Sequence, residues 1–561
     1  MQAVRLTALI VAAMAWLSAS GVLLADEWPQ VIGHSIAGDP VHIDSGAVAG
    51  KQLASGVRAY FGMPYAAPPV RDLRWREPQP VQSWQGTFNA DRKSPECIQN
   101  LRAHDINHYF GEEATTEDCL YVNVWTPPAS AATDSSGQVK RPVLVWIHGG
   151  GFTIGSSGMA NYDGEMLARK GVVFVSFNYR LGIFGFMAHP QLTAESPHHS
   201  SGNYGHLDQV AALHWVQRNI AAFGGDSANV TIMGQSAGSM SVLSLQASPL
   251  SAGLFRHAMG MSGGPGLGPP APTLQEGEQI GLEYQAALKV ASLGEMRRLP
   301  ADKLLAIQNQ CSEGCGGSLQ VRPIVDGFFL PAKALERVAS GKALDIPLVL
   351  GFARDESWNE LMTATTIEQF RLTAAREFPD RIDEFLKLYR PAAQADVGRV
   401  AADAVRDGGM ATVMRRWARA HKAAAKADVF VYVYSHPHPY TPGVEFSDHD
   451  PAKAGAYHAS EVPFFLQTLD ALNLFRATRN WTGYDRELAD QMADCIVAFA
   501  RSGSPATAAV PWPAYQLDKE RLVEFGSAVK VLQLQTARMN FMATAHMPFG
   551  LRAPTARQRA D

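Results

Sequence analysis

Five apolar runs along the chain have the length and composition of β-strands that are buried on both faces. Helical patterns separate the runs, and this alternation is typical of one parallel sheet covered by helices. The runs are RPVLVWIH (141–148), GVVFVSFNYR (171–180), NVTIMG (229–234), IPLVLGF (346–352) and DVFVYVYS (428–435). We therefore expect an α/β fold with a mostly parallel central sheet.

The clearest helical pattern is LDQVAALHWVQRNIAAFGG, at 207–225. Its apolar residues share one helical face, and Gly224 with Gly225 predicts its end. These residues are Val210, Leu213, Val216 and Ile220. Two segments rich in Ala, Gln, Arg and Leu, about 264–320 and 360–428, are predicted to be helical insertions. We find no internal repeat, so we expect one domain over 26–547 and a flexible tail over 548–561.

The run at 229–234 leads into GQSAG, which has the G-x-S-x-G spelling of a nucleophile elbow around Ser236. Such an elbow needs a buried strand before the serine, a helix after it, and glycines where the turn is too tight for side chains. The sequence after Ser236 contains no helix breaker beyond Gly238. The same spelling recurs around Ser262, but GGPGLGPPAP follows it and cannot form a helix. We expect Ser236, and not Ser262, to be the nucleophile.

A nucleophilic serine needs an acid and a base, which follow it along the chain in α/β-hydrolases. Asp355 and Glu356 come directly after the run at 346–352, at the end of the strand where such sheets build their sites. Both qualify as the acid, and from spacing alone an ordinary solvated loop explains them equally well.

Six histidines downstream of Ser236 are candidates for the base. His421 lies in a charged helical pattern and is expected at the surface, whereas His458 lies on a loop that leads into an apolar segment. The full set is His421, His436, His438, His449, His458 and His546. Spacing does not decide between them.

Three glycines, Gly149 to Gly151, follow the run at 141–148. Their backbone N–H groups, together with that of Ala237, could stabilise an oxyanion. A phosphate-binding loop would need G-K-[ST] after the glycines, and that sequence is missing.

Composition narrows the partners. The chain has 561 residues, of which 46% are hydrophobic and 18% charged, as in soluble globular proteins. A formal net charge of −4 without a long Lys or Arg run gives no indication of a nucleic-acid partner.

The N-terminus has the pattern of a secretory signal peptide over 1–25. Arg5 is followed by an apolar stretch from Leu6 to Leu24 and then by Ala25. We expect cleavage and export, to the periplasm or the medium, without stable membrane association; an uncleaved anchor is the alternative.

Five cysteines in an exported chain predict two disulfides and one thiol. Cys97 with Cys119 would close a surface loop, and Cys311 with Cys315 a very small one. Cys495 lies in a helical pattern and is expected to be a buried hydrophobic residue. No further Cys or His pair accompanies Cys311 and Cys315, so no metal site is expected.

Two segments, FGGDSANVTIMGQSAGSMSV and EDCLYVNVWTP, resemble the signatures of the type-B carboxylesterase/lipase family, which includes cholinesterases, bacterial para-nitrobenzyl esterases and fungal lipases. FGMPYAAPPVRDLRW, PVLVWIHGGGF, NYRLGIFGF and SAGLFRHAMGMSGG also resemble family segments, in the family's order. The resemblance covers nearly the whole mature chain and includes the bacterial para-nitrobenzyl-type carboxylesterases. It implies the α/β-hydrolase fold and ester hydrolysis.

Residue by residue, the resemblance implies a catalytic triad, an oxyanion hole and structural pairs. Ser236 would be the nucleophile, Glu356 the acid and His458 the base. The oxyanion donors would be Gly150, Gly151 and Ala237, and Ser262 would support the triad from behind. The structural pairs would be the disulfide Cys97–Cys119 and the ion pairs Arg74–Glu117 and Arg180–Asp208.

Several positions depart from the family pattern. Gln235 stands where cholinesterases have glutamate, and no tryptophan lies between Cys97 and Cys119, so a choline ester is not expected. Ala459 replaces the usual glycine after the base, which is tolerable if its φ is not positive. His206 replaces an apolar residue and is expected to pack in the core. Cys311 and Cys315 fall near the family's acyl pocket, which a bridged loop would narrow.

These observations predict a serine hydrolase that cleaves a small-molecule carboxylic ester through a Ser-His-Glu triad and an acyl-enzyme intermediate, with no cofactor or metal. Lipase, thioesterase or amidase activity on the same triad is the alternative, although no long lipid-binding lid is evident. A non-catalytic adhesion or binding protein of this family would have to leave a complete set of catalytic residues idle.

Overall fold

The computed structural model describes residues 36, 38–100, 114–128, 140–264, 270–313, 321–446, 449–545 and 549–551. The predicted signal peptide lies outside these residues. Within them, no helix is long and apolar enough to cross a membrane.

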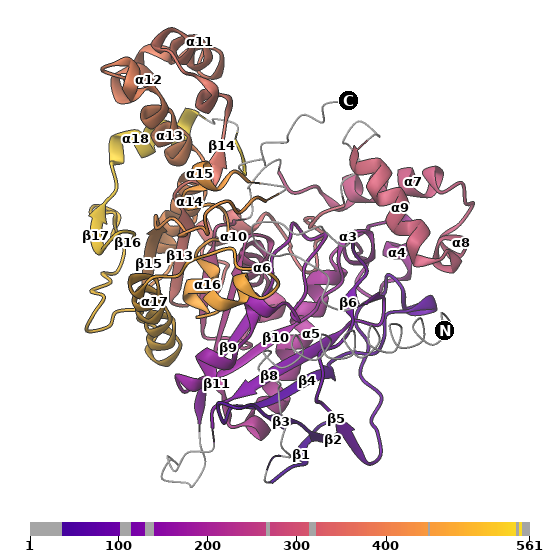
Figure 1. Cartoon of the computed structure of the whole chain (residues 1–561). Coiled ribbons are helices and arrows are strands. Elements are labelled where there is room, and N and C mark those ends of the chain that lie inside the picture. The colour runs from indigo at the N-terminus through magenta and orange to yellow at the C-terminus, as the bar shows by residue number, and fades with distance from the viewer. Residues whose placement is uncertain are drawn as a thin grey trace, which may run out of the picture.

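An eleven-stranded sheet runs through the described part of the chain (Figure 1), in the order β17-β16-β15-β13-β12-β11-β9-β10-β8-β4-β3. The strands from β16 to β10 are parallel to their neighbours, and β17, β8, β4 and β3 are antiparallel. The strands are β3 Lys51–Gln52, β4 Arg58–Pro64, β8 Tyr121–Thr126, β9 Arg141–Ile147, β10 Val173–Phe177, β11 Gly225–Gln235, β12 His257–Met261, β13 Leu348–Ala353, β15 Val429–Tyr434, β16 Arg521–Phe525 and β17 Val529–Gln533. All five predicted strands are therefore confirmed, as β9, β10, β11, β13 and β15.

Smaller sheets lie around this one. Residues Gly550–Leu551 pair with β14, so this part of the predicted flexible tail is a strand, and 552–561 lie outside the described residues. The short strands are β1 Val41–Ile43, β2 Gly46–Ala49, β5 Thr87–Asn89, β6 Glu96–Cys97, β7 Thr115–Thr116, β14 Ser357–Trp358 and β18 Gly550–Leu551.

Hydrophobic cores cover both faces of the large sheet. Along β9, Val143 and Val145 point into one core and Leu144 and Trp146 into the other, as the alternation of side chains along a strand requires. Helices α5, α6 and α14 pack on the first face, and α16 and α17 on the second. Burial on both faces explains why the strands read as continuous apolar runs.

The helices match the predicted pattern. Helix α5 contains most of the predicted segment at 207–225, and Gly224 ends the 3₁₀ turn after it at φ 80°. Helices α7 to α9 occupy the first predicted insertion and α11 to α14 the second. The helices are α2 Glu165–Arg169, α3 Gly182–Phe186, α4 Pro190–Glu195, α5 Tyr204–Asn219, α6 Ala237–Ala247, α7 Leu274–Ala287, α8 Leu293–Arg298, α9 Ala301–Glu313, α10 Ala334–Ala339, α11 Ile367–Glu377, α12 Ile382–Leu388, α13 Val397–Gly408, α14 Met410–Ala424, α15 Pro451–Ala454, α16 Val462–Phe465, α17 Gly483–Ser502 and α18 Thr536–Ala545.

The second insertion has a core of its own. Phe541 of α18 packs in a cluster with three other phenylalanines: Phe370 of α11, Phe378 directly after α11, and Phe385 of α12. Figure 1 shows α11 and α12 projecting from the rest of the molecule at the top left. We call α11, α12, α13 and α18 the helical lobe.

The structure contains the structural pairs that the family resemblance implied. Cys97 and Cys119 are bonded. Arg74 and Glu117 form an ion pair, as do Arg180 and Asp208. The side chain of Asp208 is 0% exposed and accepts from the backbone N–H, Nε and Nη2 of Arg180, so this pair ties α5 to the chain after β10.

Replacing Asp208 with asparagine should lower the free energy of unfolding by roughly 3 kcal/mol or more, because it leaves the Arg180 guanidinium charged and unpaired in the core. Urea titration measures this loss. The matched control is Asp470→Asn, which breaks the exposed pair with Arg486 and should cost less than about 1 kcal/mol. Equal losses in the two variants would contradict the structural role of the buried pair.

Candidate active site

Ser236 occupies a sharp turn between β11 and α6. Its φ of 58° and ψ of −121° are rare for a residue with a side chain, and its backbone N–H donates to Met261 O, 2.8 Å away. A Cβ on Gly238 would lie 2.0 Å from Ile147 O, and one on Gly234 would lie 2.6 Å from Gly238 C. Neither position can hold a side chain, so this G-x-S-x-G has the strand, turn and helix that the sequence predicts.

Ser262 occupies a different environment at the end of β12. The next described helix, α7, begins only at Leu274. The Ser262 hydroxyl donates to Glu461 Oε1, 3.1 Å away, and the Ser262 side chain is fully buried. Ser262 therefore stands behind the site rather than on an elbow.

Glu356 and His458 form the closest polar contact at the site. His458 Nδ1–H donates to Glu356 Oε2 over 2.5 Å, and Glu356 Oε1 accepts the backbone N–H of Ala353 over 3.0 Å. Glu356 is 0% exposed, whereas the His458 side chain is 17% exposed. A buried carboxylate thus holds one ring nitrogen and fixes the orientation of the imidazole.

Gln235 connects this pair to the elbow. Its side-chain amide nitrogen lies 3.2 Å from His458 Nε2, and Ser236 is the next residue along the chain. The His458–Glu356 pair therefore contacts the residue directly before Ser236, at the carboxyl ends of β11 and β13.

Asp355, the other candidate acid, contacts a backbone segment and not the ring of His458. It accepts the backbone N–H of Ala456 through Oδ2, 2.8 Å away, and its own N–H donates to Ala456 O, 2.9 Å away. A Cβ on Gly455 would lie 2.4 Å from Asp355 Oδ2. Asp355 thus joins the loop that carries Glu356 to the loop that carries His458.

The other candidate histidines lie elsewhere. The prediction that His421 is at the surface is wrong: it is 1% exposed and bonds with Gln246 and Ile346 O, because it falls on the face of α14 that packs on the sheet. His436 pairs with Asp485, and burial holds the pKa of His438 well below its ordinary value. His449 packs against the ring of Tyr457, and His546 lies outside the described residues.

The glycine loop after β9 packs against the elbow. A Cβ on Gly149 would lie 3.1 Å from Ser236 Cβ and 2.6 Å from Gln235 O. Gly150 and Gly151 have φ of 110° and 62°, and Gly150 O accepts the N–H groups of Thr153 and Ile154. Ala237 begins α6, so its N–H belongs to the free first turn of that helix. Gly149 thus packs on the Ser236 turn, and Ala237 is the residue directly after Ser236.

The structure tests two of the departures from the family pattern, His206 and Ala459. His206 is fully buried and stacks on Phe329 at 4.6 Å, and burial lowers its pKa to about 3, as expected for a neutral core histidine. Ala459 has a φ of 72°, so the condition for its tolerance is not met, and the loop beside His458 is strained by about 1–2 kcal/mol. Cys315 and the side chain of Cys311 lie outside the described residues.

Glu461 is a titratable residue to which the sequence analysis assigned no role. It is 0% exposed, and its pKa rises to about 7, first because of burial and then because of the Glu356 charge. In the sequence, Glu461 could have been noticed as a carboxylate directly before the apolar segment VPFFL. Glu461 is therefore a second buried carboxyl group near Glu356.

The sequence and the fold of this chain are similar to those of known proteins. Residues 38–542 match the family described as the carboxylesterase family. The chain is 35% identical to the fumonisin B1 esterase of Sphingopyxis macrogoltabida, covering 87% of this chain and 86% of that protein. It is 32% identical to the para-nitrobenzyl esterase of Bacillus subtilis strain 168, covering 85% and 93%. A solved PNB esterase structure superposes with a TM-score of 0.74 at 29% identity, covering 90% of this chain and 99% of that one.

The raised pKa of Glu461 predicts a pH-dependent penalty on stability. The folded-state pKa of about 7 exceeds the ordinary 4.5, so the unfolded chain loses this proton first as the pH rises. The penalty is absent below about pH 4.5, grows between 4.5 and 7, and is constant above. Glu461→Gln should remove it, so the variant should gain roughly 2–3 kcal/mol relative to wild type between pH 4.5 and 8.

Urea titrations of both proteins at several pH values measure this difference. Glu368→Gln, which changes an exposed glutamate on α11, should show a difference from wild type that does not vary with pH. If the difference in unfolding free energy between Glu461→Gln and wild type also did not vary with pH, Glu461 would ionise in the fold as it does in the unfolded chain.

Proposed function

Because the chain belongs to the carboxylesterase family and is a carboxylic ester hydrolase, we propose that Ser236, His458 and Glu356 carry out the hydrolysis through an acyl-enzyme intermediate. The observation that carries this proposal is the 2.5 Å contact between Glu356 and His458, one residue away from the Ser236 turn through Gln235. This is the arrangement that activates a serine hydroxyl.

In the first step, His458 Nε2 takes the Ser236 proton as Oγ attacks the ester carbonyl. Glu356 holds Nδ1–H and stabilises the imidazolium that forms. The N–H groups of Gly150, Gly151 and Ala237 stabilise the oxyanion, and in other enzymes one such donor contributes about 10²–10³ in rate. His458 then protonates the leaving alcohol.

In the second step, water replaces the alcohol. His458 takes a proton from the water as it attacks the acyl-enzyme, and the same donors stabilise the second oxyanion. The acid leaves and Ser236 regains its proton. Each step uses side chains and backbone donors of this chain.

The substrate class is a small-molecule carboxylic ester. Two relatives are named as esterases of fumonisin B1 and of para-nitrobenzyl esters, so a para-nitrobenzyl ester is a suitable first substrate. We also propose that the chain is exported after removal of 1–25. The Cys97–Cys119 disulfide supports export, because such bonds persist in oxidising compartments.

Replacing Ser236 with alanine should lower kcat for p-nitrophenyl esters by at least about 10⁴-fold, because no other side chain can form the acyl-enzyme. Stopped-flow and steady-state assays with esters from acetyl to palmitoyl measure the loss and the chain-length profile. Ser262→Ala, at the second G-x-S-x-G, is the matched control and should lose no more than about tenfold, since it acts only through Glu461. A Ser236→Ala enzyme that keeps its activity would refute the triad.

Gln235→Glu should move the acid limb of the pH profile of kcat/KM upward by about one pH unit. A carboxylate at this position would lie beside His458 Nε2 and favour the protonated imidazole, which cannot act as the base. Gln235→Met keeps the size without the charge and should leave the limb where it is. If both variants move the limb equally, the effect comes from packing and not from charge.

A further inference from the structure

A cavity of about 190 Å³ lies at the carboxyl ends of β13, β15 and β16, where the helical lobe meets the sheet. Its lining contains none of the residues that we place in the triad or the oxyanion hole. Most of its lining residues are apolar: Phe352, Ala411, Val433, Leu522, Leu532, Leu534 and Met539. Junctions between structural units are common places for small-molecule sites.

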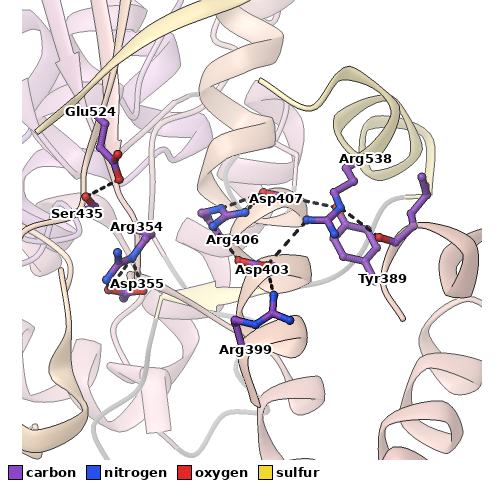
Figure 2. Close-up of polar contacts among 11 residues, drawn as sticks. Arg354, Asp355, Tyr389, Arg399, Asp403, Arg406, Asp407, Ser435, Glu524 and Arg538 are labelled. Carbon is purple, nitrogen blue, oxygen red and sulfur yellow. Dashed lines mark hydrogen bonds and ion pairs between the residues drawn. The ribbon is translucent and has the colours of Figure 1, made fainter. Parts of the chain in front are cut away.

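Four charged side chains, Arg354, Arg406, Asp407 and Glu524, form the polar part of this wall together with Gln533 and Gln535. Figure 2 shows the contacts of the charged side chains in three separate groups: Arg354 with Asp355, Glu524 with Ser435, and Arg406 with Asp403 and Asp407. The arginines are the more exposed, at 39% for Arg354 and 27% for Arg406, against 9% for Asp407 and 15% for Glu524. A ligand that enters therefore meets guanidinium groups first.

The carboxylates in these groups already have hydrogen-bond donors. Asp407 and Asp403 accept from Arg406, and Glu524 Oε1 accepts the Ser435 hydroxyl over 2.7 Å while its Oε2 pairs with Lys530 over 2.9 Å. Arg399 and Arg538 also pair with Asp403. Arg354 pairs with Asp355 and Lys530 with Glu524, whereas Arg399, Arg406 and Arg538 share Asp403 and Asp407. Each of these carboxylates thus has a cation, so none of them presents an unpaired negative charge to an anionic ligand.

We propose that this cavity binds a small amphipathic carboxylate, with its carboxylate on the Arg354 guanidinium and its alkyl chain against Leu522, Leu532 and Met539. The pairing of a planar guanidinium with a carboxylate supplies two charge-assisted hydrogen bonds, and the aliphatic wall supplies apolar burial. The volume is below the roughly 300 Å³ at which pockets begin to hold drug-sized ligands, so the acid is short. The acid released by ester hydrolysis belongs to this chemical class.

The cavity is linked to the active site through consecutive residues. Arg354 donates to Asp355, and Asp355 holds the backbone of Ala456, two residues before His458. Glu356 is the next residue after Asp355. A carboxylate that draws the Arg354 guanidinium from Asp355 would loosen this connection, so occupancy lowers kcat without competing for the catalytic centre. This coupling rests on the proposed roles of Glu356 and His458.

Isothermal titration calorimetry with octanoate tests the cavity directly and does not depend on activity. We expect millimolar or tighter binding, weakened at least about tenfold in Arg354→Met and in Leu532→Trp, which removes the cation or fills the cavity. Arg399→Met and Val531→Trp are the matched controls. Arg399 does not line the cavity, and Val531 is the neighbour of Leu532 on β17, exposed by 38%. Both controls should bind octanoate as wild type does.

Octanol and octylammonium are the matched probes of the ligand class, and both should bind at least about tenfold more weakly than octanoate. Equal affinity in Leu532→Trp and wild type would place octanoate elsewhere, in the catalytic centre above all, and would overturn the proposal. A preference for octylammonium would overturn the carboxylate assignment.

The coupling is tested by the rate of p-nitrophenyl acetate hydrolysis. Saturating octanoate should lower kcat at least twofold in wild type, and not in Leu532→Trp. Binding without any change in kcat would overturn the coupling. An enzyme that fails to turn over the ester would refute the proposed function instead, and the calorimetric result would still decide the cavity.

Discussion

The site depends on the close approach of three backbone segments at the carboxyl ends of β9, β11 and β12. Gly238 packs on Ile147 O, Gly149 packs on Gln235 O, and the Ser236 N–H bonds to Met261 O. A side chain at either glycine would separate the strands from the turn. Because these contacts join neighbouring parallel strands, the positive φ of Ser236 is held in place by β9, β11 and β12 together.

The same edge of the sheet concentrates buried charge. Glu356 and Glu461 are both fully buried, and burial together with the Glu356 charge raises the pKa of Glu461. Glu356 has two donors, the imidazole of His458 and the N–H of Ala353, and Glu461 accepts the hydroxyl of Ser262. The two donors suit Glu356 to the role proposed for it, which is to stabilise an imidazolium.

The sequence predicts those features that depend on local pattern. The apolar runs predict the strands, because a strand buried on both faces has no alternation of apolar and polar residues. GQSAG predicts the elbow, because the close backbone contacts of such a turn require glycines on either side of the serine. The acid and the base could not be chosen in this way. Asp355 and Glu356 are adjacent, and the choice between them depends on where the loop of His458 lies after about a hundred intervening residues. His421 was misplaced for a related reason: charged neighbours indicated a surface helix, but helix α14 is amphipathic and turns that histidine towards the sheet.

Three consecutive residues after β13 illustrate why this loop cannot be interpreted from spacing. Arg354 faces the cavity below the helical lobe, Asp355 holds the backbone of Ala456, and Glu356 holds the ring of His458. Successive side chains of an extended segment point in different directions, so adjacent charges reach separate environments. The strain at Ala459 falls within the same connection, one residue after His458. A loop strained on one side and held by Asp355 on the other has few alternative conformations, and this restriction keeps the imidazole between the buried carboxylate and the nucleophile.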